Sequence, residues 1–250
     1  MVVLVTGSSG QLGQSLQFIA SNYPEIKFHF YDSSTLNITD FDHCKVIFSE
    51  IKPDYCINAA AYTAVDKAES DFENVHLVNV IGAENLAKVC KNFDTVLLHV
   101  STDFVFDGNA SKPYTEEDIP NPTGVYGQTK LDGEKAIQSI WEKHFIVRTS
   151  WVYSQFANNF MKTMIRLGNE KDTLNVVSDQ IGTPTNAVDL AEVLIKIILF
   201  SEKNTQANNY GIYNFSNEGE CSWYDFAKEI FELNKIEIDL KPIPTSAYPT

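Results

Sequence analysis

The sequence has little positive charge, few cysteines and no long apolar run. Its 250 residues hold 19 Lys and Arg against 33 Asp and Glu, which gives a net charge of −14. A nucleic-acid binder needs a basic surface for the phosphates, so this composition argues against a nucleic-acid partner. No stretch approaches the ~18 apolar residues of a membrane-spanning helix, and no charged leader opens the chain, so neither a membrane span nor a signal peptide is expected.

Cysteine and histidine are too scattered to form a metal-binding pattern. No CxxC pair occurs, which predicts reduced thiols in a cytoplasmic protein without a metal site. His99 lies inside a predicted strand and is expected to be a core histidine. The cysteines are Cys44, Cys56, Cys90 and Cys221, and the histidines are His29, His43, His76, His99 and His144.

Apolar segments alternate with helical patterns over the first part of the chain. Their strands are apolar throughout, which is typical of a parallel sheet covered by helices on both faces. The predicted strands are 2–5, 27–31, 54–58, 95–100 and 145–148, and the predicted helices begin near residue 11 and span 39–50, 74–91 and 124–142.

A glycine-rich turn, Gly7-Ser8-Ser9-Gly10-Gln11-Leu12-Gly13, joins the first strand to the first helix. Glycines let the backbone turn tightly and approach a diphosphate, which the helix N-terminus then binds with free N–H groups. Asp32, at the end of the second strand, can accept the ribose hydroxyls of an adenosine and favours NADH. Ser33 and Ser34 supply no cation for a 2′-phosphate, but their hydroxyls keep NADPH open. The alternative is a glycine turn without a ligand.

The later part of the chain alternates less regularly. Together with the glycine turn it predicts an α/β fold, in which a Rossmann-type doubly wound parallel sheet carries a smaller C-terminal substrate-binding lobe. Residues 1–152 are assigned to the NAD(P)-binding domain, to which about 173–203 return, and 153–250 mainly to the lobe. Predicted helices are 158–167, 187–201 and 223–233, predicted strands are 174–177 and 236–240, and 106–122 is a loop.

A tyrosine and a lysine stand four residues apart in the predicted helix 124–142, so they share one face. An ammonium at Lys130 would lower the pKa of the Tyr126 phenol toward a range useful for acid–base chemistry. Thr102, which ends the preceding strand, can donate a hydrogen bond to a carbonyl oxygen as it gains charge. Asn79 either relays through water to Lys130 or is a solvated helix position. The pattern predicts a nucleotide-dependent reductase.

Several stretches resemble the dTDP-4-dehydrorhamnose reductase family of the extended short-chain dehydrogenase/reductase superfamily. The GxxGxxG spacing of the glycine turn is that of this superfamily, and the resemblance extends along the whole chain. The matching stretches are 5–13, Asn58-Ala59-Ala60-Ala61-Tyr62 through Glu69, Ser101-Thr102-Asp103-Phe104-Val105-Phe106, 126–131, 148–153, 158–160, 179–185 and 244–250.

The resemblance implies reduction of the C4 ketone of dTDP-4-dehydro-6-deoxy-L-mannose to dTDP-L-rhamnose by NADPH or NADH. Thr102, Tyr126 and Lys130 would be catalytic. Substrate-binding positions would be Thr102, Asp103, Trp151, Asn159 and Gln180, although Asp103 could only stabilise a turn and Trp151 could be core. Cofactor-binding positions would be Gly7, Ser9, Gly10, Gln11, Leu12, Gly13, Asp32, Asn37, Ile38, Ala59, Ala60, Ala61, Tyr62, Lys67, Asn79, Tyr126 and Lys130. For Lys67 the alternative is a solvated side chain.

The sequence departs from the family pattern at three places. Asn37 replaces the usual Asp, and it can still pair with an adenine amino group. Ser15 replaces the acidic residue of metal-bridged dimers in the family, which leaves a homodimer open but puts Mg²⁺ in doubt. The family usually continues past Thr250, so we expect its C-terminal tail to be missing from these residues.

Two other functions remain open at this point. One is the reduction of another nucleotide sugar at C4. The other is a non-catalytic regulatory role like that of the methionine adenosyltransferase β subunit, which shares the stretch 131–135. The stretches 63–69, 150–153 and 179–185 favour a reductase.

Overall fold

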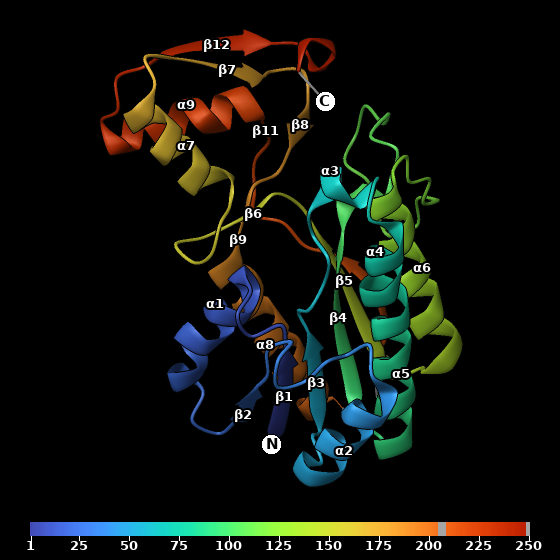
Figure 1. Cartoon of the computed structure of the whole chain (residues 1–250). Helices are drawn as coiled ribbons and strands as arrows, with labels where there is room; N and C mark the ends of the chain where they lie inside the picture. Colours follow the sequence, from blue (N-terminus) through green and yellow to red (C-terminus); the bar gives the residue numbers. More distant parts are fainter. Residues whose placement is uncertain (205–208, 249–250) are drawn as a thin grey trace.

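The computed structural model describes residues 1–204 and 209–248. Its centre is a sheet of six parallel strands, in the order β2-β1-β3-β4-β5-β10 (Figure 1). The bounds are β1 Val2–Thr6, β2 Lys27–Phe30, β3 Tyr55–Asn58, β4 Val96–Thr102, β5 His144–Thr149 and β10 Gly211–Asn214. The predicted doubly wound α/β fold is confirmed.

The strand order reverses between β1 and β3, because the chain moves from β1 outward to β2 and then returns to β3 on the other side. Sheets of this kind bind ligands outside the carboxyl ends of the strands at such a point. The glycine turn after β1 and the residues after β3 therefore stand where a ligand site is expected. The sequence did not predict β10, which is short and only partly buried at the sheet edge.

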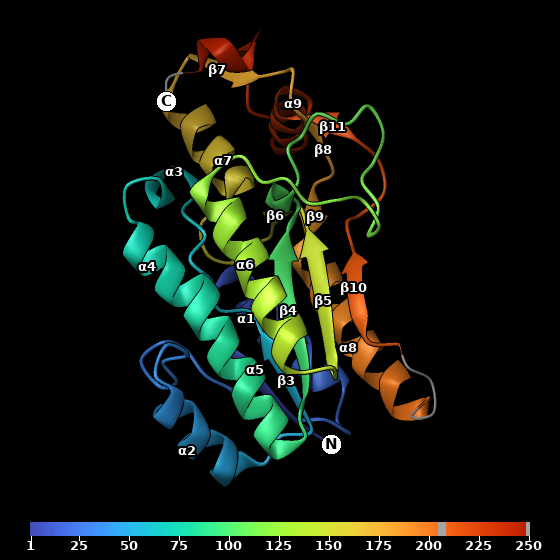
Figure 2. The ribbon, with the colours of Figure 1, turned by 90° about the vertical axis from the view of Figure 1, so that its right-hand side faces the viewer.

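Helices cover both faces of the sheet. On one face, α1 (Gln11–Ile19) and α8 (Ala187–Lys203) bury Leu16 and Ile195 against Val5. On the other, α2 (Phe41–Ile51), α5 (Gly82–Phe93) and α6 (Val125–Ile140) pack around Leu97 (Figure 2). Asp40 caps α2 by accepting a hydrogen bond from the His43 backbone N–H, as its position before the helix indicates.

Short helices precede α5 and α6. α3 (Val65–Ala68) and α4 (Phe72–His76) follow β3, and η2 (Leu77–Ile81), a π-helical segment, continues α4 into α5. η3 (Asp103–Val105) links β4 to the loop before α6. The remaining short helices are η1 (Ala20–Asn22) and η4 (Thr245–Ala247).

A smaller lobe stands beyond the carboxyl ends of the strands (Figure 1). Helices α7 (Phe160–Glu170) and α9 (Trp223–Asn234) enclose a separate core around Met164, Ile230 and Phe231. Its strands are β7 (Thr173–Val177) beside β12 (Asp239–Ile243) and β8 (Ile181–Gly182) beside β11 (Cys221–Ser222), while β6 (Val152–Tyr153) pairs with β9 (Thr185–Asn186) between the two parts.

The chain passes between the two parts more than once. Residues 173–203 were predicted to return to the NAD(P)-binding domain. Of this segment, α8 lies on the sheet, whereas β7 pairs with β12 in the lobe. β12 begins at Asp239, later than the predicted strand, because Ile236 and Ile238 pack into the lobe core after α9 ends. The domain boundaries themselves stay a prediction. Among residues 1–204 and 209–248, no helix is both long and apolar enough to cross a membrane.

Candidate active site

The glycine turn is shaped by contacts that leave no room for side chains. Gly7 has φ +68°, and a Cβ there would lie 2.6 Å from the Ala60 backbone nitrogen. A Cβ on Gly13 would lie 2.3 Å from the Gly7 carbonyl oxygen. Gly10 precedes α1, whose first turn has no acidic residue. The backbone N–H groups of this helix start are thus available for an anion.

The predicted adenosine-binding residues lie at the β2 edge of the sheet. Asp32 Oδ1 accepts hydrogen bonds from the backbone and hydroxyl of Ser34 at 2.9 and 2.6 Å, and these bonds lower the Asp32 pKa. The carboxylate is therefore ionised and can accept ribose hydroxyls. Asn37 Oδ1 accepts from the Thr39 N–H at 3.1 Å, and the Ile38 carbonyl accepts from Asn85 at 3.0 Å.

Asn79 ties the segment after β3 to the helix layer. Its side chain accepts from the Tyr62 backbone N–H at 2.9 Å and donates to the Tyr62 carbonyl at 3.2 Å and to Thr129 Oγ1 at 3.3 Å. It is buried, so the alternative of a solvated position is wrong. This bonding fixes the backbone that follows Ala59, Ala60 and Ala61. Lys67, by contrast, is 70% exposed and lies 3.8 Å from Asp71.

Thr102 and Tyr126 meet where β4 ends and α6 begins. A Cβ on Gly127 would lie 2.1 Å from the Phe104 carbonyl oxygen, so this glycine lets α6 approach η3 closely. The Phe104 ring contacts the Tyr126 ring edge-on at 5.5 Å between centroids. Thr102 Oγ1 donates to Asp103 Oδ1 at 3.0 Å.

Burial controls the protonation of this group. It raises the pKa of Tyr126 to about 12, and the Asp103 carboxylate adds to this, while the Thr102 hydroxyl acts in the opposite direction. The predicted lowering of the Tyr126 pKa is therefore wrong for this structure, since desolvation outweighs it. Burial also raises the pKa of Asp103 to about 6. The phenol is held protonated, as a proton donor requires.

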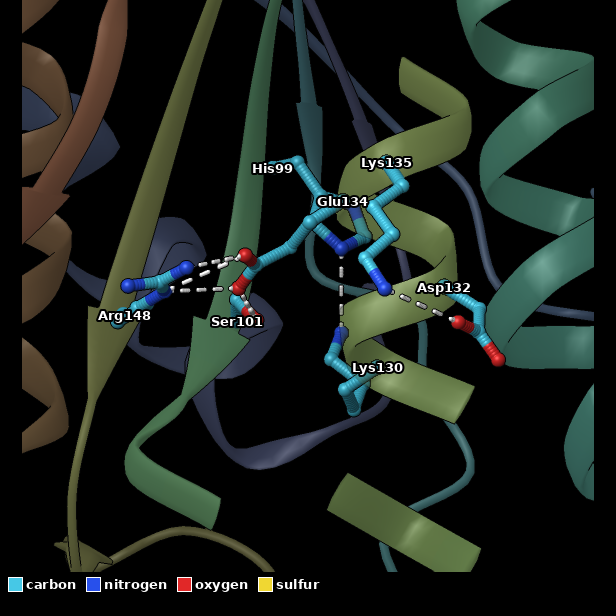
Figure 3. A network of polar contacts seen from close by, with 7 residues as sticks. All are labelled: His99, Ser101, Lys130, Asp132, Glu134, Lys135 and Arg148. Carbon is cyan, nitrogen blue, oxygen red and sulfur yellow. Dashed lines mark hydrogen bonds and ion pairs between the residues drawn. The ribbon is translucent and has the colours of Figure 1, made fainter. Parts of the chain in front are cut away.

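Lys130 lies one turn after Tyr126 and is fully enclosed. Its Nζ donates to the Val100 carbonyl at 2.8 Å and lies 3.2 Å from His99 Nε2 (Figure 3). Burial lowers the pKa of Lys130 to about 8, while the Glu134 carboxylate acts in the opposite direction. The site thus combines a neutral phenol with an amine that titrates near neutral pH.

A buried ion pair stands behind the site. Arg148 Nη2 on β5 donates to Glu134 Oε2 on α6 at 2.6 Å, and Ser101 Oγ donates to Glu134 Oε1 at 2.5 Å (Figure 3). Both charged side chains are at most 3% exposed. The pair joins α6 to β5, and Ser101, which precedes Thr102 in the chain, links it to β4.

Two stacked indoles connect the sheet to the lobe. Trp151 and Trp223 lie 3.5 Å apart at an interplanar angle of 11°. Trp151 has φ +47°, which is strained for a bulky residue, and a Cβ on Gly182 would lie 2.4 Å from its ring. Gln180 Oε1 accepts from Trp223 Nε1 at 3.2 Å. Trp151 and Gln180, both predicted for the substrate, are thus brought together through Trp223.

Asn159 reaches from the lobe to the start of α1. Its Nδ2 donates to Gln11 Oε1 and to the Ser154 carbonyl, each at 2.7 Å, while its Oδ1 caps α7 by accepting from the Lys162 N–H. Gln11 Nε2 in turn donates to the Val152 carbonyl at 3.0 Å. A predicted substrate residue and a predicted cofactor residue therefore touch.

Three residues of this region were not predicted as site residues. His99 and Ser101 lie on the same face of β4 as Leu97. Two polar residues on a buried strand face could have been recognised in the sequence as candidate site residues. Trp223 gave no such signal, because only the docking of the lobe brings it to Trp151. A dinucleotide fits this site, since the close packing at Gly7 and Gly13 brings the N-terminus of α1, which no side chain caps, to the carboxyl end of β1, where a diphosphate can bind.

Comparison with known proteins gives consistent matches. The family model described as the RmlD substrate binding domain matches residues 1–250. A dTDP-4-dehydrorhamnose reductase from Aggregatibacter actinomycetemcomitans is 43% identical over 99% of this chain and 86% of its own.

Solved structures agree with the sequence matches. A dTDP-4-dehydrorhamnose reductase from Clostridium acetobutylicum has a TM-score of 0.93 at 42% identity, covering 100% of this chain and 86% of that one. A dTDP-4-dehydrorhamnose reductase from Bacillus anthracis in complex with NADP has a TM-score of 0.92 at 40% identity, covering 98% and 84%. The chain belongs to the dTDP-4-dehydrorhamnose reductase family, as its motifs predict.

Proposed function

We infer that the protein reduces the C4 ketone of dTDP-4-dehydro-6-deoxy-L-mannose to dTDP-L-rhamnose with NADPH or NADH. Its membership of the reductase family supports this reaction. The observation that carries it is the meeting of Thr102 with a buried, protonated Tyr126 at the carboxyl end of β4. A reduction ends with a proton on the new hydroxyl, and this phenol is placed to give one.

The roles of the individual residues follow from their surroundings. The nicotinamide cofactor, when bound, supplies the hydride. Tyr126 donates its phenolic proton to the C4 oxygen, and Thr102 donates a hydrogen bond to that oxygen as charge develops. Lys130 binds the nicotinamide ribose one turn behind the phenol. Asp103, Trp151, Asn159 and Gln180 bind the sugar nucleotide.

The cofactor is held along the switch point of the sheet. The turn from Gly7 to Gly13 and the first turn of α1 hold the diphosphate, and Asp32, Asn37 and Ile38 hold the adenosine. The segment from Ala59 to Tyr62, fixed by Asn79, borders the ribose, and Lys67 balances phosphate charge. Support comes from the close packing at Gly7 and Gly13.

The cellular location and the partners of the protein are proposed from its composition. Four free cysteines and a net charge of −14 favour a cytoplasmic enzyme without nucleic-acid or membrane partners. A homodimer is proposed without a bridging metal, because Ser15 is buried and donates to the Gln11 carbonyl at 2.9 Å.

A coupled assay tests the reaction. dTDP-4-dehydro-6-deoxy-glucose, a 3,5-epimerase and NADPH or NADH are mixed with the protein, and loss of nicotinamide absorbance is followed. Oxidation that depends on the epimerase supports the proposal. Oxidation without the epimerase indicates another nucleotide-sugar ketone as substrate, and no oxidation of either cofactor indicates the regulatory role.

A further inference from the structure

Helix α6 carries Tyr126 in its first turn but has no cap of its own there. The residue before the helix is Gly124, which has no side chain, and the first turn holds no acidic residue. The first backbone N–H groups of a helix have no partner within the helix, and helix ends fray. The phenol that is proposed to give the proton therefore stands on the part of α6 that its own residues hold least.

A carboxylate from another element supplies the missing cap. Glu69 follows α3, and its Oε1 accepts a hydrogen bond from the backbone N–H of Val125, the first residue of α6, at 2.8 Å. The two residues are 56 positions apart in the sequence. A carboxylate at this place also meets the positive end of the helix dipole. Glu69 thus does for α6 what Asp40, an N-cap residue within the local sequence, does for α2.

The glycine at position 124 leaves room for this contact. A Cβ on Gly124 would lie 2.9 Å from Glu69 Oε1, so a larger residue would press on the carboxylate. The Gly124 backbone has φ −132° and ψ 167°, an extended conformation that is open to any residue. The backbone conformation therefore does not call for glycine here, whereas the space that the carboxylate takes does.

The turn that carries Glu69 is itself held against the start of α6. Ala68, the preceding residue, is fully buried in one apolar cluster with Tyr126. Asp71, two residues later, accepts a hydrogen bond from the Tyr62 hydroxyl at 3.0 Å. The carboxylate of Glu69 is thus presented to α6 by a turn that is fixed on both sides.

We propose that Glu69 is a positioning residue, which caps α6 from outside the helix and so holds the Tyr126 phenol beside Thr102. Its consequence for the reaction rests on the proposed function. Without the cap the first turn of α6 frays, and the phenol spends less time where it can give a proton to the ketone oxygen. Cofactor affinity should change little, because the turn from Gly7 to Gly13 lies on another element.

The position of the phenol can be followed without turnover. Carbon-13 spectra of the tyrosine rings, assigned with Tyr126→Phe, report Tyr126 through its edge-on contact with the Phe104 ring. In Glu69→Ala the Tyr126 resonance should shift or broaden. The Gln128 amide, which donates to the Gly124 carbonyl at 3.0 Å, should exchange with solvent about tenfold faster, while amides in the last turn of α6 keep their rates.

Further variants separate the cap from a general loss of stability. Glu69→Gln keeps an acceptor oxygen and should stay close to the parent in both measurements. Glu73→Ala is the matched control, because Glu73 is a nearby exposed carboxylate without a side-chain hydrogen bond or ion pair in residues 1–204 and 209–248. Glu69→Asp, one methylene shorter, should change in the same direction as Glu69→Ala and replaces it if the alanine variant does not fold.

Two results of these spectra would overturn the proposal. One is a Tyr126 resonance or a Gln128 exchange rate that stays at the parent value in Glu69→Ala. The other is a change of equal size in Glu69→Ala and Glu73→Ala.

Kinetics test the consequence for the reaction. In the coupled assay Glu69→Ala should lower kcat by about tenfold or more and change the Kd for NADPH by less than about twofold, and Glu69→Gln should restore most of kcat. A loss confined to NADPH affinity, or an equal fall of kcat in Glu69→Gln, would reject the positioning role. If the parent protein itself oxidises neither cofactor, the proposed function fails, while the spectra still decide whether Glu69 places Tyr126.

Discussion

Tyr126 is suited to give a proton because burial holds its pKa at about 12, well above the pH of an assay. We expect Tyr126→Phe to reduce kcat by about 10²–10⁴-fold, the usual contribution of a general acid. NADPH binding should change little, because the ring and its contact with Phe104 remain. Steady-state rates and fluorescence titration with NADPH measure the two effects. A variant with near-normal kcat would refute the role of the phenol.

Burial of the ionised Asp103 carboxylate lowers the free energy of unfolding at neutral pH, and this effect can be measured. Its pKa is raised from 3.8 to about 6 by burial, so between these values the folded protein binds more protons than the unfolded chain. Its contribution to the free energy of unfolding therefore falls as pH rises from about 4 to about 6. Asp103→Asn should be more stable than the parent at pH 7.5, by up to about 3 kcal/mol, and equally stable near pH 4.

Urea unfolding at the two pH values checks this prediction, with Asp107→Asn as the control. Asp107 is a half-buried carboxylate whose pKa is lowered to about 2 by its hydrogen bonds, so its loss should destabilise rather than stabilise at pH 7.5. If Asp103 also binds the sugar, the more stable variant will have a higher KM. Equal stability of Asp103→Asn and the parent at both pH values would show that the carboxylate is solvated.

At the scale of elements, the Glu134–Arg148 pair joins α6 to β5 inside the protein. Arg148→Met should lower the free energy of unfolding by about 3–5 kcal/mol, because it leaves the Glu134 carboxylate buried without its cation. Adding Glu134→Leu should recover most of that loss, since no charge then stays buried. Urea unfolding of both single variants and the double variant measures the coupling. If the losses of unfolding free energy in the two single variants simply add in the double variant, the predicted coupling is wrong.

The elements also show where sequence reasoning succeeds. The turn from Gly7 to Gly13 and the Tyr126–Lys130 pair were predicted because their geometry is local: one depends on steric limits within a turn, the other on helix periodicity. The His99–Lys130 contact and the Trp151–Trp223 stack were not predicted, since each joins residues of separate elements. The edge strand β10 was missed because its side chains are too exposed to show an apolar pattern.

At the scale of the molecule, a chain of net charge −14 is proposed to bind two anions, a dinucleotide and a dTDP-sugar. The net charge of the chain does not determine whether these anions bind, because the groups next to each anion have the larger effect. The start of α1 offers unpaired backbone N–H groups, and Lys130 offers a titratable amine in a buried setting. We expect the net negative charge to disfavour long nucleic acids, while the start of α1 and Lys130 bind small phosphorylated ligands in the proposed function.

The two parts of the molecule meet where Asn159, the N-cap of α7, bonds to Gln11 of α1, so the proposed cofactor and substrate sites share one link. We expect bound NADP⁺ to tighten dTDP binding in the parent, because ordering the start of α1 also orders Asn159. Asn159→Ala should lose most of this coupling. It also removes the N-cap of α7, which should lower the free energy of unfolding by about 1 kcal/mol. Asn169→Ala is the control, since Asn169 lies on the same helix and bonds only to the Ile165 carbonyl among the hydrogen bonds of the described residues. Calorimetric titration of dTDP with and without NADP⁺ measures the coupling in all three proteins. Coupling of equal size in Asn159→Ala and the parent would mean that the two sites communicate by another route.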